Sequence, residues 1–169
     1  NGYSAMALGK WHLTPDEHIT PAGPFDRFPI GQGFERYYGF MGGETSQWEP
    51  DLWADNHRVQ APGRPEDGYH LTDDLVDHAI EWIATLKAVA PSKPFFTYVA
   101  FGATHSPHHV PREYIEPYRG VFDAGWAASR SVPPSTTSAG VGIALPPPLG
   151  GSKGKSSSRS PDAVSGVAI

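Results

Sequence analysis

Residues 72–101 read TDDLVDHAIEWIATLKAVAPSKPFFTYVAF and join a helical pattern to a strand pattern, which decides the fold class. Thr72 is a typical helix N-cap, and the two aspartates that follow it suit the positive end of the helix dipole. Apolar residues then recur at helical spacing, at Leu75, Val76, Ala79, Ile80, Ile83 and Leu86. The pattern predicts an amphipathic helix from Thr72 to about Ala88, which ends before Pro91 and Pro94.

The residues after this helix predict a strand. The run Phe95–Phe101 is short, apolar and rich in aromatic and β-branched side chains, which is typical of a strand buried on both faces. The run Tyr3–Leu8 predicts another buried strand. The order strand, long connection, helix, strand predicts an α/β layered fold. The connection, Pro15–Pro65, lacks a sustained period; a segment of that length in a compact domain is functional or contributes short strands, and we expect a wall beside a site.

The composition changes abruptly near residue 130. All five Trp, all eight His and 17 of the 18 acidic residues precede residue 131. Residues 131–169 contain no aromatic residue and are rich in Ser, Pro and Gly. Such a segment cannot bury enough apolar surface to offset its ordering entropy. We therefore predict a globular part at 1–130 and a disordered tail at 131–169.

Composition also excludes several classes of function. The chain has no Cys, so it holds no disulfide, thiolate metal site or cysteine-derived nucleophile. A net charge of −5 argues against a protein that tracks nucleic-acid phosphates. No apolar stretch approaches the roughly 20 residues that span a bilayer. We assign no nucleic-acid role and no membrane span, and the sequence indicates neither a cellular location nor an oligomeric state.

The segment Leu8–Leu13, LGKWHL, carries a candidate anion site. Lys10 and His12 are two residues apart, so in an extended backbone both side chains project to one face. A fixed cation and an imidazole suit an anionic substrate oxygen, which lysine neutralises and histidine binds as a donor. The same spacing also fits a surface lysine near a structural histidine.

A second candidate cluster, Ala103–Pro111, comes directly after the predicted strand Phe95–Phe101. Ligands of α/β sheets bind beyond the carboxyl ends of strands, so His105 is well placed to be functional. The three histidines within five residues, His105, His108 and His109, also fit a zinc site or a loop with exposed imidazoles. We favour the non-metal reading, because no carboxylate or thiolate motif accompanies them.

Other acidic and aromatic residues are also considered as site residues. Capping and a solvated helix face account for four acidic residues, Asp73, Asp74, Asp77 and Glu81. Asp51 and Asp55 lack the spacing of a calcium-binding loop. If exposed, four aromatic side chains could stack on sugars and would favour a non-catalytic anion- or glycan-binding module; the alternative is that they pack in the core or in loops. They are Tyr37, Tyr38, Trp48 and Trp53.

A series of short blocks resembles the sulfatases, a family of the alkaline-phosphatase-like α/β/α fold. In order, the blocks are GY at 2–3, GKWHL at 9–13, GFERYYGF at 33–40, KPFF at 93–96, ATHSPH at 103–108, YRG at 118–120 and GW at 125–126. Their order and approximate spacing carry the resemblance over about residues 2–130. It implies a partial α/β/α sandwich from an arylsulfatase, a sulfuric ester hydrolase. A related phosphodiesterase or phosphonate hydrolase of the same fold is the alternative enzyme reading.

The resemblance also implies cofactors and residue roles. In this family a Cys or Ser within Cys/Ser-x-Pro-x-Arg becomes formylglycine, whose hydrate attacks the sulfate sulfur, and a calcium-like divalent cation neutralises sulfate oxygens. By position, Lys10 and His12 correspond to residues that bind the sulfate and the formylglycine. His105 corresponds to the histidine that assists binding of the sulfate or the leaving group. The implied substrate is a sulfate ester.

The family's other active-site parts have no counterpart in this sequence. Its nucleophile motif and first metal-binding aspartates lie upstream of the GKWH block, and its remaining metal ligands lie downstream. Ser131-Val132-Pro133-Pro134-Ser135 lacks the arginine and follows that block, so we reject it as a nucleophile motif. Ala127 stands where the family has an acidic residue. We therefore expect an internal fragment that is inactive alone, and a frameshift or gene disruption after about residues 126–130 is a hypothesis.

Overall fold

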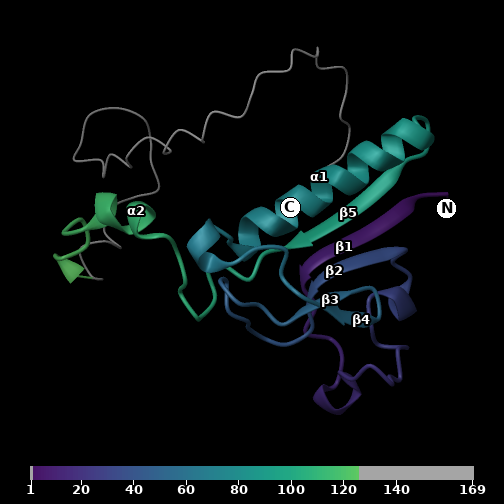
Figure 1. Ribbon diagram of the computed structural model, residues 1–169, viewed down its shortest axis with the longest axis horizontal. Helices are drawn as coiled ribbons and strands as arrows, with labels where there is room; N and C mark the ends of the chain where they lie inside the picture. Colours follow the sequence, from purple (N-terminus) through teal and green to yellow (C-terminus); the bar gives the residue numbers. More distant parts are fainter. Residues whose placement is uncertain (1, 126–169) are drawn as a thin grey trace. The chain divides into compact units, whose positions relative to one another are not determined.

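One long helix and a five-stranded sheet are the main regular elements of the computed structural model, which describes residues 2–125 (Figure 1). The chain divides into two compact units that meet between residues 109 and 110, and each is described by itself. The first unit contains β1 (Ser4–Lys10), β2 (Arg36–Phe40), β3 (Leu52–Ala54), β4 (His57–Val59), α1 (Leu71–Val89) and β5 (Phe95–Ala100). The predicted helix and both predicted strands are confirmed, so the unit has an α/β fold.

Three neighbouring strands of the sheet are parallel. The strand order is β4-β3-β2-β1-β5, with β1 parallel to both β2 and β5. The β2–β3 and β3–β4 pairs are antiparallel. Because the carboxyl ends of parallel strands meet at one edge of a sheet, the segments after β1, β2 and β5 leave the sheet on the same side.

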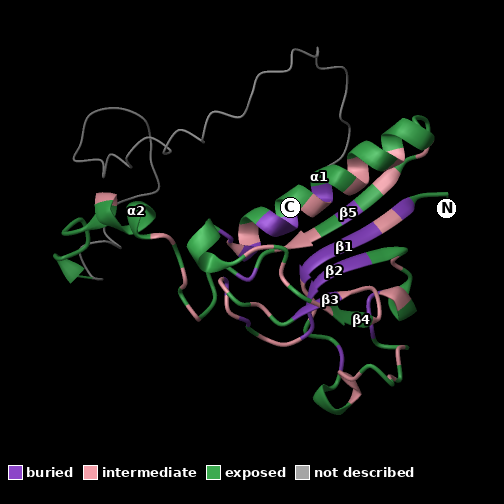
Figure 2. Ribbon diagram, viewed as in Figure 1, coloured by how far each residue is buried: buried purple, intermediate pink, exposed green. Residues whose placement is uncertain are grey.

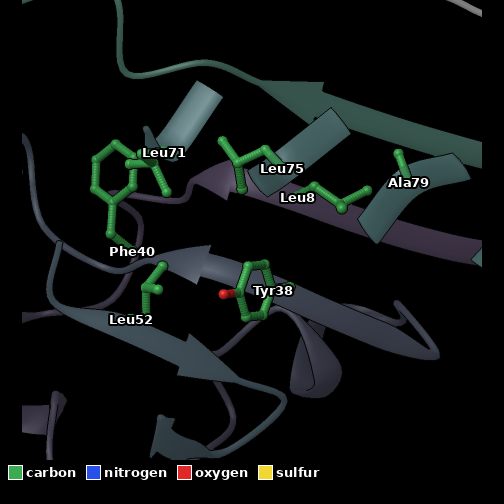
Figure 3. Close-up of a cluster of buried hydrophobic side chains, with 7 residues drawn as sticks. All are labelled: Leu8, Tyr38, Phe40, Leu52, Leu71, Leu75 and Ala79. Atoms are coloured by element: carbon green, nitrogen blue, oxygen red, sulfur yellow. The ribbon is translucent and has the colours of Figure 1, made fainter. Parts of the chain in front are cut away.

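Helix α1 covers one face of the sheet. Leu71, Leu75 and Ala79, one helical turn apart, pack on a cluster from the strands (Figure 3). The strand residues of this cluster are Leu8, Tyr38, Phe40 and Leu52. The helix N-cap is His70 rather than the predicted Thr72: the His70 Nδ1 accepts the backbone N–H of Thr72 at 3.2 Å. The imidazole takes the role that we expected of the threonine hydroxyl.

The opposite face of the sheet is covered by the segment between β1 and β2. Side chains from this segment pack with Ala7, Tyr37, Met41 and Trp53, and Phe28 is fully buried among them. Short 3₁₀ turns at Asp16–His18, Ile30–Gln32 and Pro65–Asp67 interrupt the long connection. The expectation that Pro15–Pro65 contributes short strands is confirmed by β2, β3 and β4. No helix within residues 2–125 has the length and apolar character that a membrane crossing requires.

Strand β5 differs from the prediction in its burial. Phe96 and Tyr98 are 45% and 43% exposed, so the strand is not buried on both faces (Figure 2). Among the described strands β5 pairs with β1 alone, and helix α1 covers only one of its faces. On the other face the Phe96 ring stacks on Phe34 at a centroid distance of 6.3 Å. The apolar run identified the strand but not which faces are covered.

Asp74 also differs from the prediction, because it is buried rather than on a solvated face. Its carboxylate accepts the hydroxyls of Tyr38 and Tyr69, each at 2.8 Å, and lies 3.0 Å from the His78 imidazole. Burial raises the pKa of both tyrosines far above the ordinary value, and the hydrogen bond to Asp74 and its negative charge add to the rise. Asp74 thus ties α1 to β2 through a charged hydrogen-bond network.

The aromatic side chains considered for sugar stacking are mostly core residues. Trp53 and Tyr37 are fully buried, and Tyr38 is 5% exposed. Burial also raises the pKa of Tyr37, whose hydroxyl donates to the Gly9 carbonyl at 2.9 Å. Trp48 is half-buried and packs edge-on against His70. Three of the four are therefore core residues, because β2 and β3 place them inside the sheet layers, and the condition for sugar stacking is not met there.

The second unit is described up to residue 125 and contains α2 (Arg112–Ile115) and a 3₁₀ turn (Glu116–Tyr118). Glu116 accepts hydrogen bonds from Arg119 and Arg112. These two cations lower the pKa of Glu116, the Arg119 bond having the larger effect. The predicted tail at 131–169, and the departure at Ala127, lie outside the described residues.

Candidate anion-binding site

The candidate site lies at the edge of the sheet where the three parallel strands end. Lys10 is the last residue of β1, and in the β1–β2 register it pairs with Phe40, the last residue of β2. On the other side, Gly9 pairs with Ala100, the last residue of β5. His12 and His105 therefore follow two adjacent strands beyond the same edge. The sequence predicted both loops, and the topology explains why they leave the sheet at the same edge.

The segment after β1 continues to pair with the segment after β2. The backbone N–H groups of Trp11 and His12 donate to the carbonyls of Phe40 and Met41, each at 3.0 Å. His12 itself has φ +54°, in the left-handed region. The alternation of side chains in an extended strand therefore ends before His12. The backbone hydrogen bonds to Phe40 and Met41, and not strand periodicity, set the direction of the His12 side chain. Lys10 is half-buried and His12 is exposed.

A glycine allows the β2–β3 connection to approach His12. A Cβ added at Gly43 would lie 2.9 Å from Cε1 of the His12 ring and 3.1 Å from Nε2. Real Cβ contacts are almost never that short, so any other residue at position 43 would displace the ring or the loop. Residues 41–44, which we call the 41–44 loop, thus contact His12 through both Met41 and Gly43.

The same loop contacts His105 through Glu44. The His105 Nδ1 lies 2.8 Å from the Ser106 carbonyl and 3.6 Å from Oε2 of Glu44. The Ser106 hydroxyl donates to that carboxylate oxygen at 2.8 Å. The 41–44 loop therefore touches both candidate histidines, although 62 residues separate Glu44 from Ser106 in the chain.

His109 has a structural environment. Its Nδ1 lies 3.4 Å from both the Ser46 hydroxyl and the Gln47 backbone N–H, and its carbonyl lies 3.2 Å from the His70 Nε2. Its ring stacks against Trp48. Within residues 2–125 no three His, Cys, Asp or Glu side chains are grouped so that they could hold a metal ion.

Comparison with known proteins identifies the family. The model of the family described as Sulfatase matches residues 1–160. This chain belongs to the sulfatase family. An arylsulfatase of Klebsiella aerogenes is 30% identical over 138 residues, which cover 75% of this chain and 26% of that protein. Arylsulfatase J of Mus musculus is 28% identical over 133 residues, covering 72% and 20%.

Solved structures agree with this assignment. The crystal structure of Ps i-CgsB in complex with k-i-k-neocarrahexaose superimposes with a TM-score of 0.53 and 26% identity, covering 68% of this chain and 27% of that one. The alkaline-phosphatase-like α/β fold expected of a sulfatase is thereby confirmed for this chain. The sulfatase chain spans about a quarter of the length of the relatives that it matches.

The described residues of this sulfatase chain do not fit the family's cation. The two aspartates considered for calcium have other partners: Asp51 pairs with Arg58 at 3.1 Å, and Asp55 pairs with Arg36 at 3.4 Å and accepts the Tyr37 backbone N–H. The chain also has no Cys, and none of its serines stands in a Ser-x-Pro-x-Arg motif from which a formylglycine could form. The candidate site is therefore an arrangement of Lys and His side chains, which can neutralise an anion and donate hydrogen bonds to it.

Sequence reasoning missed the contribution of the 41–44 loop. Gly43 limits how His12 lies, and Glu44 and Ser106 surround the Nδ1 of His105. One signal was present, namely the Gly42-Gly43-Glu44 run directly after an apolar strand. A glycine pair after a strand marks a close approach of backbone to another group, which is the role that Gly43 has here.

Proposed function

We propose that this chain carries part of the sulfate-binding site of a sulfuric ester hydrolase of the arylsulfatase type. In this proposal Lys10, His12 and His105 bind the sulfate group of the substrate. The observation that carries the proposal is the convergence of their segments at the carboxyl ends of adjacent parallel strands. Family membership supports it, because the three residues lie within the range that the sulfatase model matches, residues 1–160.

The chemistry of these side chains fits a sulfate ester. The Lys10 ammonium provides a fixed positive charge and up to three donors for sulfate oxygens. A neutral imidazole has only one N–H donor, and at His105 this nitrogen, Nδ1, faces the Ser106 carbonyl at 2.8 Å. His105 therefore donates to sulfate through Nε2–H when its ring is protonated, and it then also provides positive charge. Hydrogen bonds in which one partner is ionised are about twice as strong as neutral ones. The group should therefore favour tetrahedral oxyanions over neutral ligands.

We further propose that the 169-residue chain binds sulfate esters without hydrolysing them. In sulfatases the formylglycine hydrate supplies the nucleophile and the divalent cation supplies charge neutralisation. The sequence has no Cys/Ser-x-Pro-x-Arg motif, and residues 2–125 hold no fitting group of metal ligands. Binding groups alone cannot replace a covalent attack, because only interactions that strengthen in the transition state accelerate the reaction.

Two other readings have less support. The glycan-binding module depended on exposed aromatic residues, and three of the four are buried. The phosphodiesterase or phosphonate hydrolase reading has the same fold, but the family match is to sulfatases.

The test is a hydrolysis assay with 4-nitrophenyl sulfate on the purified 169-residue chain, with and without added calcium. We expect no release of 4-nitrophenolate above the buffer rate. Release that disappears in a Lys10→Met variant would show that the chain is catalytic as it stands. It would overturn the binding-only proposal while supporting the role of Lys10.

A further inference from the structure

Glu44 lies between two segments that the fold brings together beyond the sheet edge. Its carboxylate oxygen Oε2 accepts the Ser106 hydroxyl at 2.8 Å and lies 3.6 Å from the His105 Nδ1. Its neighbour Gly43 lies against the His12 ring. One four-residue loop thus reaches both histidines, and Glu44 provides the negative charge on the His105 side.

The contacts of His105 determine which ring nitrogen carries its proton. Nδ1 lies 2.8 Å from the Ser106 carbonyl oxygen, which can only accept a hydrogen bond. Nδ1 must therefore be the protonated nitrogen of the neutral ring. The nearby Glu44 carboxylate favours the same N–H by electrostatic attraction. Within residues 2–125 no hydrogen bond engages Nε2, so that nitrogen is left for a ligand.

We propose that Glu44 is a positioning residue for His105: it holds Nδ1–H toward the loop, so that Nε2 faces the bound sulfate ester and donates to it when the ring is protonated. The inference rests on the proposed function of His105. It follows a general pattern in which a carboxylate or carbonyl on one imidazole nitrogen fixes the tautomer and orientation of the other. The side chains of Glu44 and His105 are 57% and 55% exposed, so the pair should add little to stability and act mainly on the tautomer.

The experiment uses ¹⁵N NMR of the 169-residue chain, with labelled histidine, at pH 8, where an ordinary imidazole is neutral. The ¹⁵N shifts of the two ring nitrogens report the ratio of the Nδ1–H to the Nε2–H form. We expect the Nδ1–H form to predominate at His105, although the Nε2–H form predominates in free histidine. A Glu44→Gln variant should lower this ratio roughly two- to fivefold, the range that an exposed charge pair contributes.

Two variants separate the positioning of His105 by Glu44 from the general effect of removing one negative charge. Glu49→Gln removes the same charge from an exposed residue of the same connection and should leave the His105 ratio unchanged. Ser106→Ala removes the hydroxyl that holds the Glu44 carboxylate and should lower the ratio in the same direction as Glu44→Gln. The His78 ring, which stacks on Tyr38 at 3.7 Å, reports in the same spectra whether each variant is folded.

The outcomes are decisive in each direction. A wild-type chain without excess Nδ1–H at His105, or a Glu44→Gln variant with an unchanged ratio, overturns the proposal. Titration with inorganic sulfate at about pH 6, where an ordinary imidazole is partly protonated and Nε2–H can donate, then tests the proposed function separately, because the tautomer ratio needs no ligand. A changed ratio in Glu44→Gln with no response of His105 to sulfate would support the Glu44–His105 arrangement and contradict the sulfate-binding role.

Discussion

Replacement of Asp74 by alanine should destabilise the first unit strongly. The sequence pattern assigns Asp74 to a solvated helix face, where the loss would be small, but the structure buries it. The substitution leaves the hydroxyls of Tyr38 and Tyr69 without the acceptor that each contacts at 2.8 Å. A buried donor left without a partner costs about 1–3 kcal/mol. Two such donors, partly relieved by water, give an expected loss of about 2–5 kcal/mol in the free energy of unfolding, a large fraction of the roughly 5–15 kcal/mol typical of a domain.

Urea unfolding followed by tryptophan fluorescence measures this loss, with Asp73→Ala as the matched control. Asp73 lies in the same helical turn but is exposed, so its loss should cost less than about 1 kcal/mol, from the helix dipole alone. Removal of both hydroxyls in the Asp74→Ala background should recover part of the stability, because no unpaired donor then remains. Equal costs for Asp73→Ala and Asp74→Ala would refute the buried network.

Two further predictions concern the sheet and the site. Because the pKa of Tyr38 is raised, its contribution to stability is complete below pH 10, the ordinary tyrosine value, and is lost as the pH rises above it. Tyr38→Phe should therefore reduce the alkaline loss of stability by up to about 1.4 kcal/mol per pH unit in urea titrations between pH 9 and roughly 11; an unchanged slope would contradict the burial of that hydroxyl. Gly43→Ala should weaken sulfate binding, because its Cβ would lie 2.9 Å from the His12 ring, whereas a Cβ at Gly42 has an ordinary 3.6 Å contact. Calorimetric titration with inorganic sulfate compares Gly43→Ala with the control Gly42→Ala. Equal affinities would show that the position of the His12 ring does not affect sulfate binding.

Local patterns predicted the elements but not their surroundings. The helical period placed α1 to within a residue at each end, because an apolar stripe of that length has few alternatives. The three-residue strands β3 and β4 have too few residues for a period to show. The burial of Asp74 was not predictable, because one of its two donors, Tyr38, lies 36 residues away.

The candidate site was predictable only in part, because local patterns place residues on their own strands but do not show which strands are neighbours. Lys10 ends one strand and His105 follows another, and that local signal places them at the sheet edge. That their segments leave the sheet at the same edge depends on β5 pairing with β1, which is a property of topology. The contact of Glu44 with Ser106 depends on three strands being in register, and no short motif carries that information.

The most direct test of the account is the affinity of the 169-residue chain for 4-methylumbelliferyl sulfate, measured by equilibrium dialysis for wild type, Lys10→Met and Lys93→Met. Lys93 carries the same charge but precedes β5, at the other end of the strand, and pairs with Glu35 at 3.7 Å. A charge-assisted hydrogen bond contributes about 1.5–3 kcal/mol, so Lys10→Met should weaken binding at least tenfold while Lys93→Met leaves it unchanged. Equal affinities for the three proteins, or no binding by wild type, would contradict a sulfate-binding site at this sheet edge.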